Sequence, residues 1–264
     1  MVSAMSDIRA RVRDILEFHR VLDEANGVAP NDFLCQIRHG CTEEEMVSLE
    51  NRLGVCLPPS YRSFLLQVDG CDRLGLGFGG LLRAREVRWF REDNSDWISA
   101  YLEDDRIDLC EEEHRIYGPD QKSFRFRRAY LPGLLQIGDV YDGSVYLLNP
   151  LVRDESSEWE AWSFTNSYPG AFREPSFLVL VEKTWNKLKQ EVHLGEISLN
   201  EDRLISNAVR DLQRSIDEAQ ISHQDAVISY VDQKLATDEV FAAWARRVNP
   251  YTRLILALQS KGAR

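Results

Sequence analysis

Apolar residues in the first part of the chain recur every three or four positions, which is the spacing of one helix face. The pattern predicts an amphipathic helix over residues 7–24, followed by a loop that contains Gly27 and Pro30. Such a helix buries one stripe of side chains, so we expect it to cover a core from outside. Its inward stripe consists of Ile8, Val12, Ile15, Leu16, His19 and Leu22.

A second helix is predicted by a capping box, in which Thr42 is followed three residues later by Glu45. The Thr oxygen and the Glu carboxylate can each accept a hydrogen bond from a backbone N–H that has no partner in the first turn. The helix should therefore start at Glu43. Gly54 can adopt the positive φ that ends it. The apolar stripe of this helix consists of Met46, Leu49 and Leu53.

A third helix follows at once, after a step that contains two prolines. Pro58 and Pro59 cannot lie inside a helix, but proline suits a first turn because its φ is preset and its missing N–H is not needed there. We expect this helix to end near Asp69 and Gly70. One of its faces carries Tyr61, Phe64, Leu65 and Val68.

Strand-like patterns occupy the middle of the chain, and an antiparallel hairpin is predicted to turn near Asp142 and Gly143. The chain returns to helix over residues 176–192. A helix pair, antiparallel strands and a closing helix together predict an α+β fold with a central, mainly antiparallel sheet flanked by helices. The strand-like segments are LLRAREVRWF from residue 81, residues 134–138, residues 144–149 and residues 159–164.

After residue 195 the apolar residues again follow helical spacing, and three or four consecutive amphipathic helices are predicted. Asn249 and Pro250 suit the start of the last one, with Asn as the cap and Pro in the first turn. We therefore divide the chain into an α+β domain at residues 1–195 and a helical appendage at residues 196–264. The apolar positions are Leu204, Ala208, Leu212, Ile216, Val227, Val231, Leu235, Phe241, Trp244, Val248, Leu254, Ile255 and Leu258.

A long polar insertion at residues 92–130 interrupts the strand-like part, and its charges are divided by sign. Residues 92–113 hold ten acidic residues against one Arg, whereas residues 114–130 are basic. A solvated face is the favoured interpretation of the acids, and a protein-binding surface is the second. A divalent-metal site is a third, although the ordered Asp-x-Asp-x-Asp-Gly and the bidentate Glu of a calcium loop are missing.

Composition narrows the class of protein. Hydrophobic residues make up 44% and charged residues 28% of the 264 residues, which is ordinary for a globular protein and disfavours disorder. No apolar run approaches the roughly 20 residues of a membrane span, and charges occupy the positions where a signal peptide is apolar. We therefore expect a cytoplasmic protein without a membrane partner. The net charge of -11 disfavours nucleic acid as the direct ligand and favours a basic protein partner.

The residues that carry chemistry do not form a known catalytic or metal-binding pattern. GLGFGG at residues 75–80 matches a dinucleotide-binding loop literally, but it follows a predicted helix and precedes a strand-like run, so a helix-to-strand connection is favoured. The five histidines have no metal-ligand spacing and are expected at the surface or the edge of the core. The five cysteines lack a CxxC pair and are expected to be reduced and mostly structural. We predict no catalytic residue, no metal and no cofactor.

Aromatic residues alternate with Glu and Gly in EWEAWSFTNSYPGAF, residues 158–172. Aromatic side chains beside a basic groove would suggest base stacking, but the flanking charges here are mainly acidic. Core packing is the favoured interpretation, and a recognition patch is the second. The aromatic residues concerned are Trp159, Trp162, Tyr168 and Phe172.

The segment SLENRLGVCLPPSYRSFLLQVDG, residues 48–70, resembles the signature of the SUKH superfamily. In that family a helix ending in Leu-Gly leads through Leu-Pro into a second helix that ends near Asn-Gly, where this chain has Asp69-Gly70. The resemblance covers roughly residues 42–190 and leaves out the insertion and residues 200–262. Further matching segments are DGSVYLLNP (142–150), EWEAWSF (158–164) and YPGAFREPSFLVLV (168–181), which resemble the later hairpin, the Trp-bearing strand and the closing helix.

The resemblance implies an α+β domain without catalytic residues. Bacterial members are chiefly immunity proteins of polymorphic toxin systems, which bind and neutralise a toxin domain delivered by a neighbouring cell, and yeast relatives act in cell-wall regulation. We therefore expect a non-enzymatic immunity protein that covers the active site or substrate groove of its cognate toxin. A nuclease toxin is favoured because nucleases commonly carry basic grooves, and deaminase or ADP-ribosyl-transferring toxins follow.

The expected contact with the toxin is the acidic part of the insertion, because complementary charge raises the association rate. Two alternatives belong to other classes: a regulatory scaffold that binds a cellular protein with no toxin involved, and an enzyme whose site assembles from scattered residues. The signature residues Leu53, Gly54, Leu57, Pro58 and Tyr61 are expected to affect stability before binding. The partner-binding residues are Asp104, Asp105, Asp108, Glu111 and Glu112.

Overall fold

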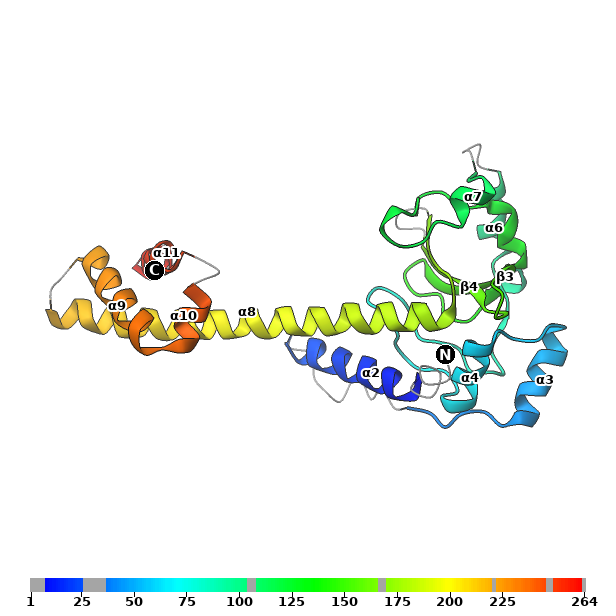
Figure 1. Ribbon diagram of the computed structural model, residues 1–264, viewed down its shortest axis with the longest axis horizontal. Helices are drawn as coiled ribbons and strands as arrows, with labels where there is room; N and C mark the ends of the chain where they lie inside the picture. Colours follow the sequence, from blue (N-terminus) through cyan, green and yellow to red (C-terminus); the bar gives the residue numbers. More distant parts are fainter. Residues whose placement is uncertain are drawn as a thin grey trace. The chain divides into compact units, whose positions relative to one another are not determined.

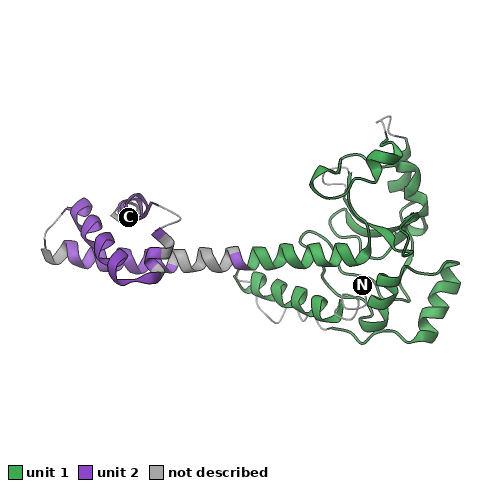
Figure 2. Ribbon diagram, viewed as in Figure 1, with its two compact units in different colours: residues 1–192 green, residues 193–264 purple. Residues whose placement is uncertain are grey.

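The computed structural model describes residues 8–25, 37–103, 108–165, 170–219, 222–245 and 249–262 (Figure 1). The chain divides into two compact units, residues 1–192 and residues 193–264 (Figure 2). One helix, α8 (Phe177–Ala219), contributes residues to both units. The five strands that the described residues form all lie in the first unit.

Among the described residues, three helices precede the sheet, and each lies close to its predicted residues. α2 (Ile8–Ala25) buries the stripe from Ile8 to His19. α3 (Glu43–Leu53) begins with the predicted capping box, in which Glu45 N–H donates to Thr42 Oγ1 at 3.2 Å and Thr42 N–H donates to Glu45 Oε2 at 2.8 Å. Gly54 ends α3 with φ 70°. The local sequence signals therefore define this helix correctly at both ends.

The step between α3 and α4 (Pro59–Gln67) is held by two carboxylates. Glu50 Oε1 accepts a hydrogen bond from the Leu57 N–H at 2.8 Å, which joins the end of α3 to the Leu-Pro-Pro segment. Glu158 caps the start of α4, because it accepts hydrogen bonds from the Ser60 N–H at 2.8 Å and the Ser60 hydroxyl at 2.6 Å. Burial raises the pKa of Glu158, and these two hydrogen bonds oppose that rise. The helix pair is thus tied to the sheet.

The sheet has five antiparallel strands in the order β1-β2-β3-β4-β5, each paired with the next along the chain. β2 and β3 form the predicted hairpin, and its turn has positive φ at both Asp142 (45°) and Gly143 (68°), as a tight two-residue turn requires. The α+β prediction with a mainly antiparallel sheet is confirmed. The strands are β1 (Arg88–Trp89), β2 (Leu135–Gln136), β3 (Ser144–Arg153), β4 (Trp159–Thr165) and β5 (Gly170–Glu174).

The two faces of the sheet are covered by different segments. On the side that we call the helix face, Tyr146 and Leu148 of β3 share a core with α2, α3, α4 and the start of α8. On the opposite side, the insertion face, Val145 and Leu147 of β3 share a second core with the insertion. Successive strand residues point to opposite faces, so this alternation along β3 is what a sheet buried on both sides requires.

The insertion covers the sheet and is not only a charged surface. It contains the short helices α6 (Ser95–Leu102) and α7 (Glu111–His114) together with 3-10 turns, and α5 (Phe90–Asp93) overlaps its start. Its aromatic residues pack on Trp162 and Phe164 of β4. The charges of this segment predict a solvated face, whereas its apolar residues are buried against the sheet. The aromatic residues that it contributes are Trp97, Tyr101, Phe126 and Tyr130.

The insertion also covers the outer edge of β5. Ser123 O accepts a hydrogen bond from the Ala171 N–H at 2.8 Å, and Gln121 Oε1 accepts one from the Arg173 N–H at 2.7 Å. A Cβ atom at Gly170 would lie 2.1 Å from Ser123 O, so only glycine permits this close approach. Unpaired strand edges invite pairing with other chains. Gln121 and Ser123 therefore close the edge at these two positions.

The second unit is helical. Three helices, α9 (His223–Thr237), α10 (Glu239–Ala245) and α11 (Pro250–Gly262), share a core with the last part of α8. α11 starts as predicted, with the Thr252 N–H donating to Asn249 Oδ1 at 3.2 Å. Trp244 and Val248, which the pattern also assigns to this core, lie outside the side chains that the structure describes. The core includes Ala208, Val209, Leu212, Val227, Val231, Phe241, Leu254 and Leu258.

The apolar pattern predicts a helix at residues 176–192 that is separate from the helices after residue 200, whereas α8 is continuous over both. Gly195 is the only helix-breaking residue type in that stretch, and a single glycine costs a helix only about 1 kcal/mol relative to Ala. The structural division at residues 192 and 193 falls within this helix. That residues 1–195 constitute a domain of their own stays a prediction.

Candidate functional site

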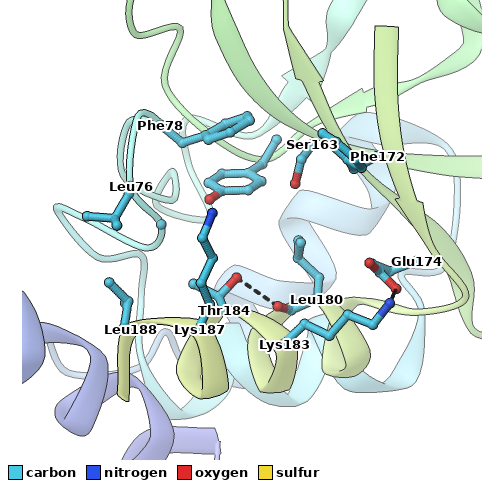
Figure 3. Close-up of a pocket in the computed structure, with 12 residues that line it drawn as sticks. Leu76, Phe78, Ser163, Phe172, Glu174, Leu180, Lys183, Thr184, Lys187 and Leu188 are labelled. Atoms are coloured by element: carbon cyan, nitrogen blue, oxygen red, sulfur yellow. Dashed lines mark hydrogen bonds and ion pairs between the residues drawn. The ribbon is translucent and has the colours of Figure 1, made fainter. Parts of the chain in front are cut away.

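A groove opens on the helix face of the sheet, between α8 and the glycine-rich segment at residues 75–80 (Figure 3). Its volume is about 240 Å³. One wall is formed by side chains of α8, the floor by β3, β4 and β5, and the other wall by the glycine-rich segment. The lining residues are Gly75, Leu76, Phe78, Tyr146, Ser163, Phe172, Glu174, Leu180, Lys183, Thr184, Lys187 and Leu188.

The glycine-rich segment is a wall of the groove because it can approach the sheet closely. A Cβ atom at Gly75 would lie 2.4 Å from Tyr146 Oη, and the Gly75 N–H donates to that hydroxyl. The Phe78 and Tyr146 rings stack with their centroids 4.6 Å apart. The segment follows α4 and precedes β1, so it opens no helix. A dinucleotide loop requires a helix N-terminus at this point, and the favoured helix-to-strand connection is what the structure contains.

The groove exposes apolar surface on both sides. Leu76 is 41% exposed and Phe172 is 40% exposed. The sequence analysis assigned Phe172 to the core together with Trp159 and Trp162. Both tryptophans are buried, but Phe172 is not, because alternation along β5 turns it toward the groove. Tyr168 lies outside the described residues.

The charged residues of the groove give it a local positive balance. Lys183 Nζ lies 2.5 Å from Glu174 Oε2. Burial raises the pKa of Glu174, and the hydrogen bond and charge of Lys183 oppose that rise. Lys187 is exposed and extends from α8 into the groove, where no ion pair joins it to another described residue (Figure 3). Two ammonium groups thus face one carboxylate.

The five predicted partner-binding residues have unequal surroundings. Asp104 and Asp105 lie outside the described residues. Asp108 pairs with Arg128, and Glu111 pairs with Arg115 at 3.2 Å. Both ion pairs lie within the insertion. Acidic residues of its first part therefore pair with basic residues of its second part. Glu112 is exposed, and hydrogen bonds to backbone and to Cys110 lower its pKa. Of the predicted partner-binding residues that the structure describes, Glu112 forms no ion pair, whereas Asp108 and Glu111 do.

A buried polar cluster, which no sequence pattern predicts, lies between the insertion and the sheet. Glu160 Oε2 accepts hydrogen bonds from Asn149 Nδ2 at 2.9 Å and Trp162 Nε1 at 2.5 Å, and His114 Nε2 lies 3.1 Å away. Arg173 Nη1 donates to the backbone oxygen of His114. Glu160 Oε1 and Arg173 Nε and Nη2 are buried without a hydrogen-bond partner among the described residues. The hydrogen bonds that do form connect the insertion to β3, β4 and β5, so we call these residues the buried polar cluster.

Two histidine predictions are wrong. His19 and His114 were expected at the surface or the edge of the core, yet each is only 1% exposed. His19 Nε2 lies 3.1 Å from the Leu74 backbone oxygen, and His114 belongs to the buried polar cluster. The only signal for His19 was its place on the inward stripe of α2. Glu160, which lies against the His114 ring, and Arg173, which donates to its backbone oxygen, are 46 and 59 residues away in sequence, so no local pattern points to the cluster.

Among the residues that the structure describes, no three His, Cys, Asp or Glu side chains are grouped closely enough to hold a metal ion. Cys41 and Cys71 are buried free thiols, and Cys56 and Cys110 are exposed free thiols. Burial raises the pKa of Cys41 to about 11, which disfavours the reactive thiolate. In the described part of the chain, none of the helices has both the length and the apolar character that crossing a membrane demands.

The groove and the buried polar cluster both lie within a segment that matches a known family. The model of the SMI1 / KNR4 family (SUKH-1) matches residues 40–188, which is more than half of the chain. The chain belongs to the SMI1 / KNR4 family. The SUKH resemblance inferred from residues 48–70 is thereby confirmed. The SUKH-1 match begins just before the capping box of α3 and ends at Leu188, on the wall of the groove.

The SUKH-1 match includes the whole sheet and the insertion, and it leaves out α2 and the second unit. No curated protein matches the chain. Proteins of the SUKH family generally bind partner proteins and are generally non-catalytic. An open groove with apolar walls, on the sheet that the family match covers, is suited to binding part of another molecule.

Proposed function

We propose that this SUKH-1 protein is an immunity protein, which binds a cognate toxin domain and neutralises it by covering its active site or substrate groove. The observation that carries the proposal is the family match over residues 40–188, because the family is consistent with toxin immunity or regulation. Inhibition by occlusion requires no catalytic group in the inhibitor. It requires a surface that excludes substrate from the toxin.

Net charge favours a basic toxin. The chain carries 32 basic and 43 acidic residues, and complementary fields raise association rates and reject partners of the wrong charge. Enzymes that act on nucleic acids need basic surfaces to bind phosphates. A nuclease is therefore the first candidate for the toxin.

A co-expression experiment tests the function. The product of the adjacent upstream gene, or its C-terminal domain, is expressed in cells with and without this protein, and survival and co-purification are measured. The immunity proposal expects toxicity that this protein relieves, together with a stable one-to-one complex. Toxicity without rescue or binding contradicts immunity.

The acidic part of the insertion is the proposed steering surface, and charge reversal provides a sharp test. Changing Asp104, Asp105 and Glu112 to Lys is expected to lower the association rate constant about tenfold at low salt, because charge complementarity acts mainly on association. The difference should shrink as salt rises, since surface charges are screened over about 10 Å at 0.1 M. Stopped-flow measurement at several salt concentrations gives the rate constants.

The matched control carries the same change in net charge elsewhere. Glu44, Glu155 and Glu239 are exposed and lie outside the insertion, so their change to Lys should reduce the rate constant far less. Equal losses in the two triple variants would show that only net charge matters. The insertion would then have no special part in the contact.

Regulation of a cellular protein is the second candidate, because the family is also consistent with regulatory roles. A harmless upstream gene product that does not bind this protein would favour it. The acidic part of the insertion would then contact a cellular protein instead of a toxin.

A further inference from the structure

We propose that the groove between α8 and residues 75–80 receives a single segment of the toxin, which inserts an apolar side chain and places a neighbouring carboxylate beside Lys187. This inference rests on the proposed function and names the surface that supplies affinity. The acidic surface would then govern how fast the proteins meet, and the groove would govern how long they stay together.

The size and lining of the groove suit a side chain. Its volume of about 240 Å³ lies below the roughly 300–1,000 Å³ that is usual for small-molecule sites. Leu76 and Phe172 present apolar surface at its sides, and the buried Leu180 and Leu188 extend that surface along α8. Binding energy at protein interfaces concentrates where an apolar or aromatic anchor fills such a pocket.

The charge of the groove indicates that an acidic residue lies next to the apolar side chain in the toxin segment. The Lys183 charge is opposed by Glu174 at 2.5 Å, whereas Lys187 extends into the groove and pairs with no carboxylate of the described residues (Figure 3). In a chain of net charge -11, this is a place where an incoming carboxylate meets attraction. A partly desolvated ion pair at the edge of an apolar contact adds specificity.

The walls of the groove are held in place before any partner arrives. Gly75 and Phe78 are fixed against Tyr146 by a hydrogen bond and a ring stack. On the opposite wall, Thr184 Oγ1 donates to the Leu180 backbone oxygen at 2.9 Å, and Leu188 is buried. A preformed site loses little conformational entropy on binding, so more of the contact energy appears as affinity.

The β5 edge of the sheet is closed to the addition of a peptide strand. A peptide can bind a sheet by adding a strand to its edge, but Gln121 and Ser123 already take the outward N–H groups of Arg173 and Ala171 on β5. The groove is lined by residues of β5 as well as α8, and it can admit side chains of a partner without adding a strand.

The test uses the full-length protein and a catalytically inactivated C-terminal domain of the upstream gene product. Leu76→Glu and Lys187→Glu are each expected to raise the Kd at least tenfold, measured by calorimetry, and Lys187→Arg should retain near-wild-type affinity. Lys189→Glu is the matched control, because Lys189 is exposed on the same helix, lies over the Trp185 ring and does not line the groove. Its Kd should change less than threefold.

Both test positions are exposed, so thermal unfolding of each variant should stay within a few degrees of the wild type. If the wild type binds and both groove variants bind equally well, the groove is not the contact, although the immunity function stands. An equal loss of affinity in Lys189→Glu also contradicts binding in the groove, because the effect would then come from the overall charge of α8. Absence of wild-type binding and rescue removes the immunity proposal, and the groove inference with it.

Discussion

Replacing Glu160 with Ala is expected to lower the free energy of unfolding by about 3–5 kcal/mol, the cost of removing one partner from a buried ionic cluster. Glu160 is 1% exposed and accepts hydrogen bonds from Asn149 and Trp162. Without its carboxylate, these donors lose their acceptor and Arg173 stays buried without a nearby negative charge. A buried donor left unsatisfied costs about 1–3 kcal/mol by itself.

Two further variants separate charge from shape. Glu160→Gln keeps the size of the side chain and one oxygen acceptor, so a smaller loss is expected. Glu155→Ala removes an exposed carboxylate and should change stability by about 0.5 kcal/mol or less. Urea unfolding followed by tryptophan fluorescence measures all three. A loss in Glu160→Ala no larger than that in Glu155→Ala would mean that the buried polar cluster does not hold the insertion.

Replacing Phe164 with Ala is the second large expected effect, again about 3–5 kcal/mol of unfolding free energy. The Phe164 ring is fully buried, and its centroid lies 5.1 Å from that of Trp97, 5.2 Å from Tyr101 and 5.5 Å from Phe126. All three partners belong to the insertion. The substitution leaves a cavity where the insertion meets the sheet, and rigid neighbours close such a cavity only in part.

The matched control is Tyr141→Ala, which removes a ring that is 59% exposed in the hairpin turn, and a change of about 0.5 kcal/mol or less is expected. Limited proteolysis gives a second measurement, because loosening the insertion should speed cleavage within residues 103–127 in Phe164→Ala alone. An unchanged cleavage pattern together with a loss below about 1 kcal/mol would contradict the packing of the insertion on β4.

Several parts of the fold were predictable because a few neighbouring residues decide them. The Thr42 and Glu45 capping box fixed the start of α3, and Asp142-Gly143 marked the hairpin turn. The α+β class and the SUKH family followed from the order of such elements and from the kink after Leu53. The continuity of α8 was missed because a change in amphipathic pattern suggested a break, while no proline enforced one.

The candidate site was predictable only in pieces. GLGFGG was correctly interpreted as a connection, but its role as a wall of the groove depends on Tyr146, about 70 residues later in the chain. Phe172 was assigned to the core because composition does not tell which face of an edge strand is covered. The contact role of the acidic residues stays a prediction, although two of them are now known to pair within the insertion.

The sequence by itself determined α2, α3 and α4, the capping box of α3, the hairpin, the family and the overall acidic charge, because each depends on local backbone chemistry or on a sum over residues. Only the tertiary structure decided that the charged insertion covers one face and the edge of the sheet, that Glu160 and Arg173 lie buried beneath it, and that the opposite face keeps a groove. These features depend on contacts between residues far apart in the sequence, such as His114 with Glu160, 46 positions away, and with Arg173, 59 positions away. Contacts of that kind form only when burial of the whole core brings distant segments together.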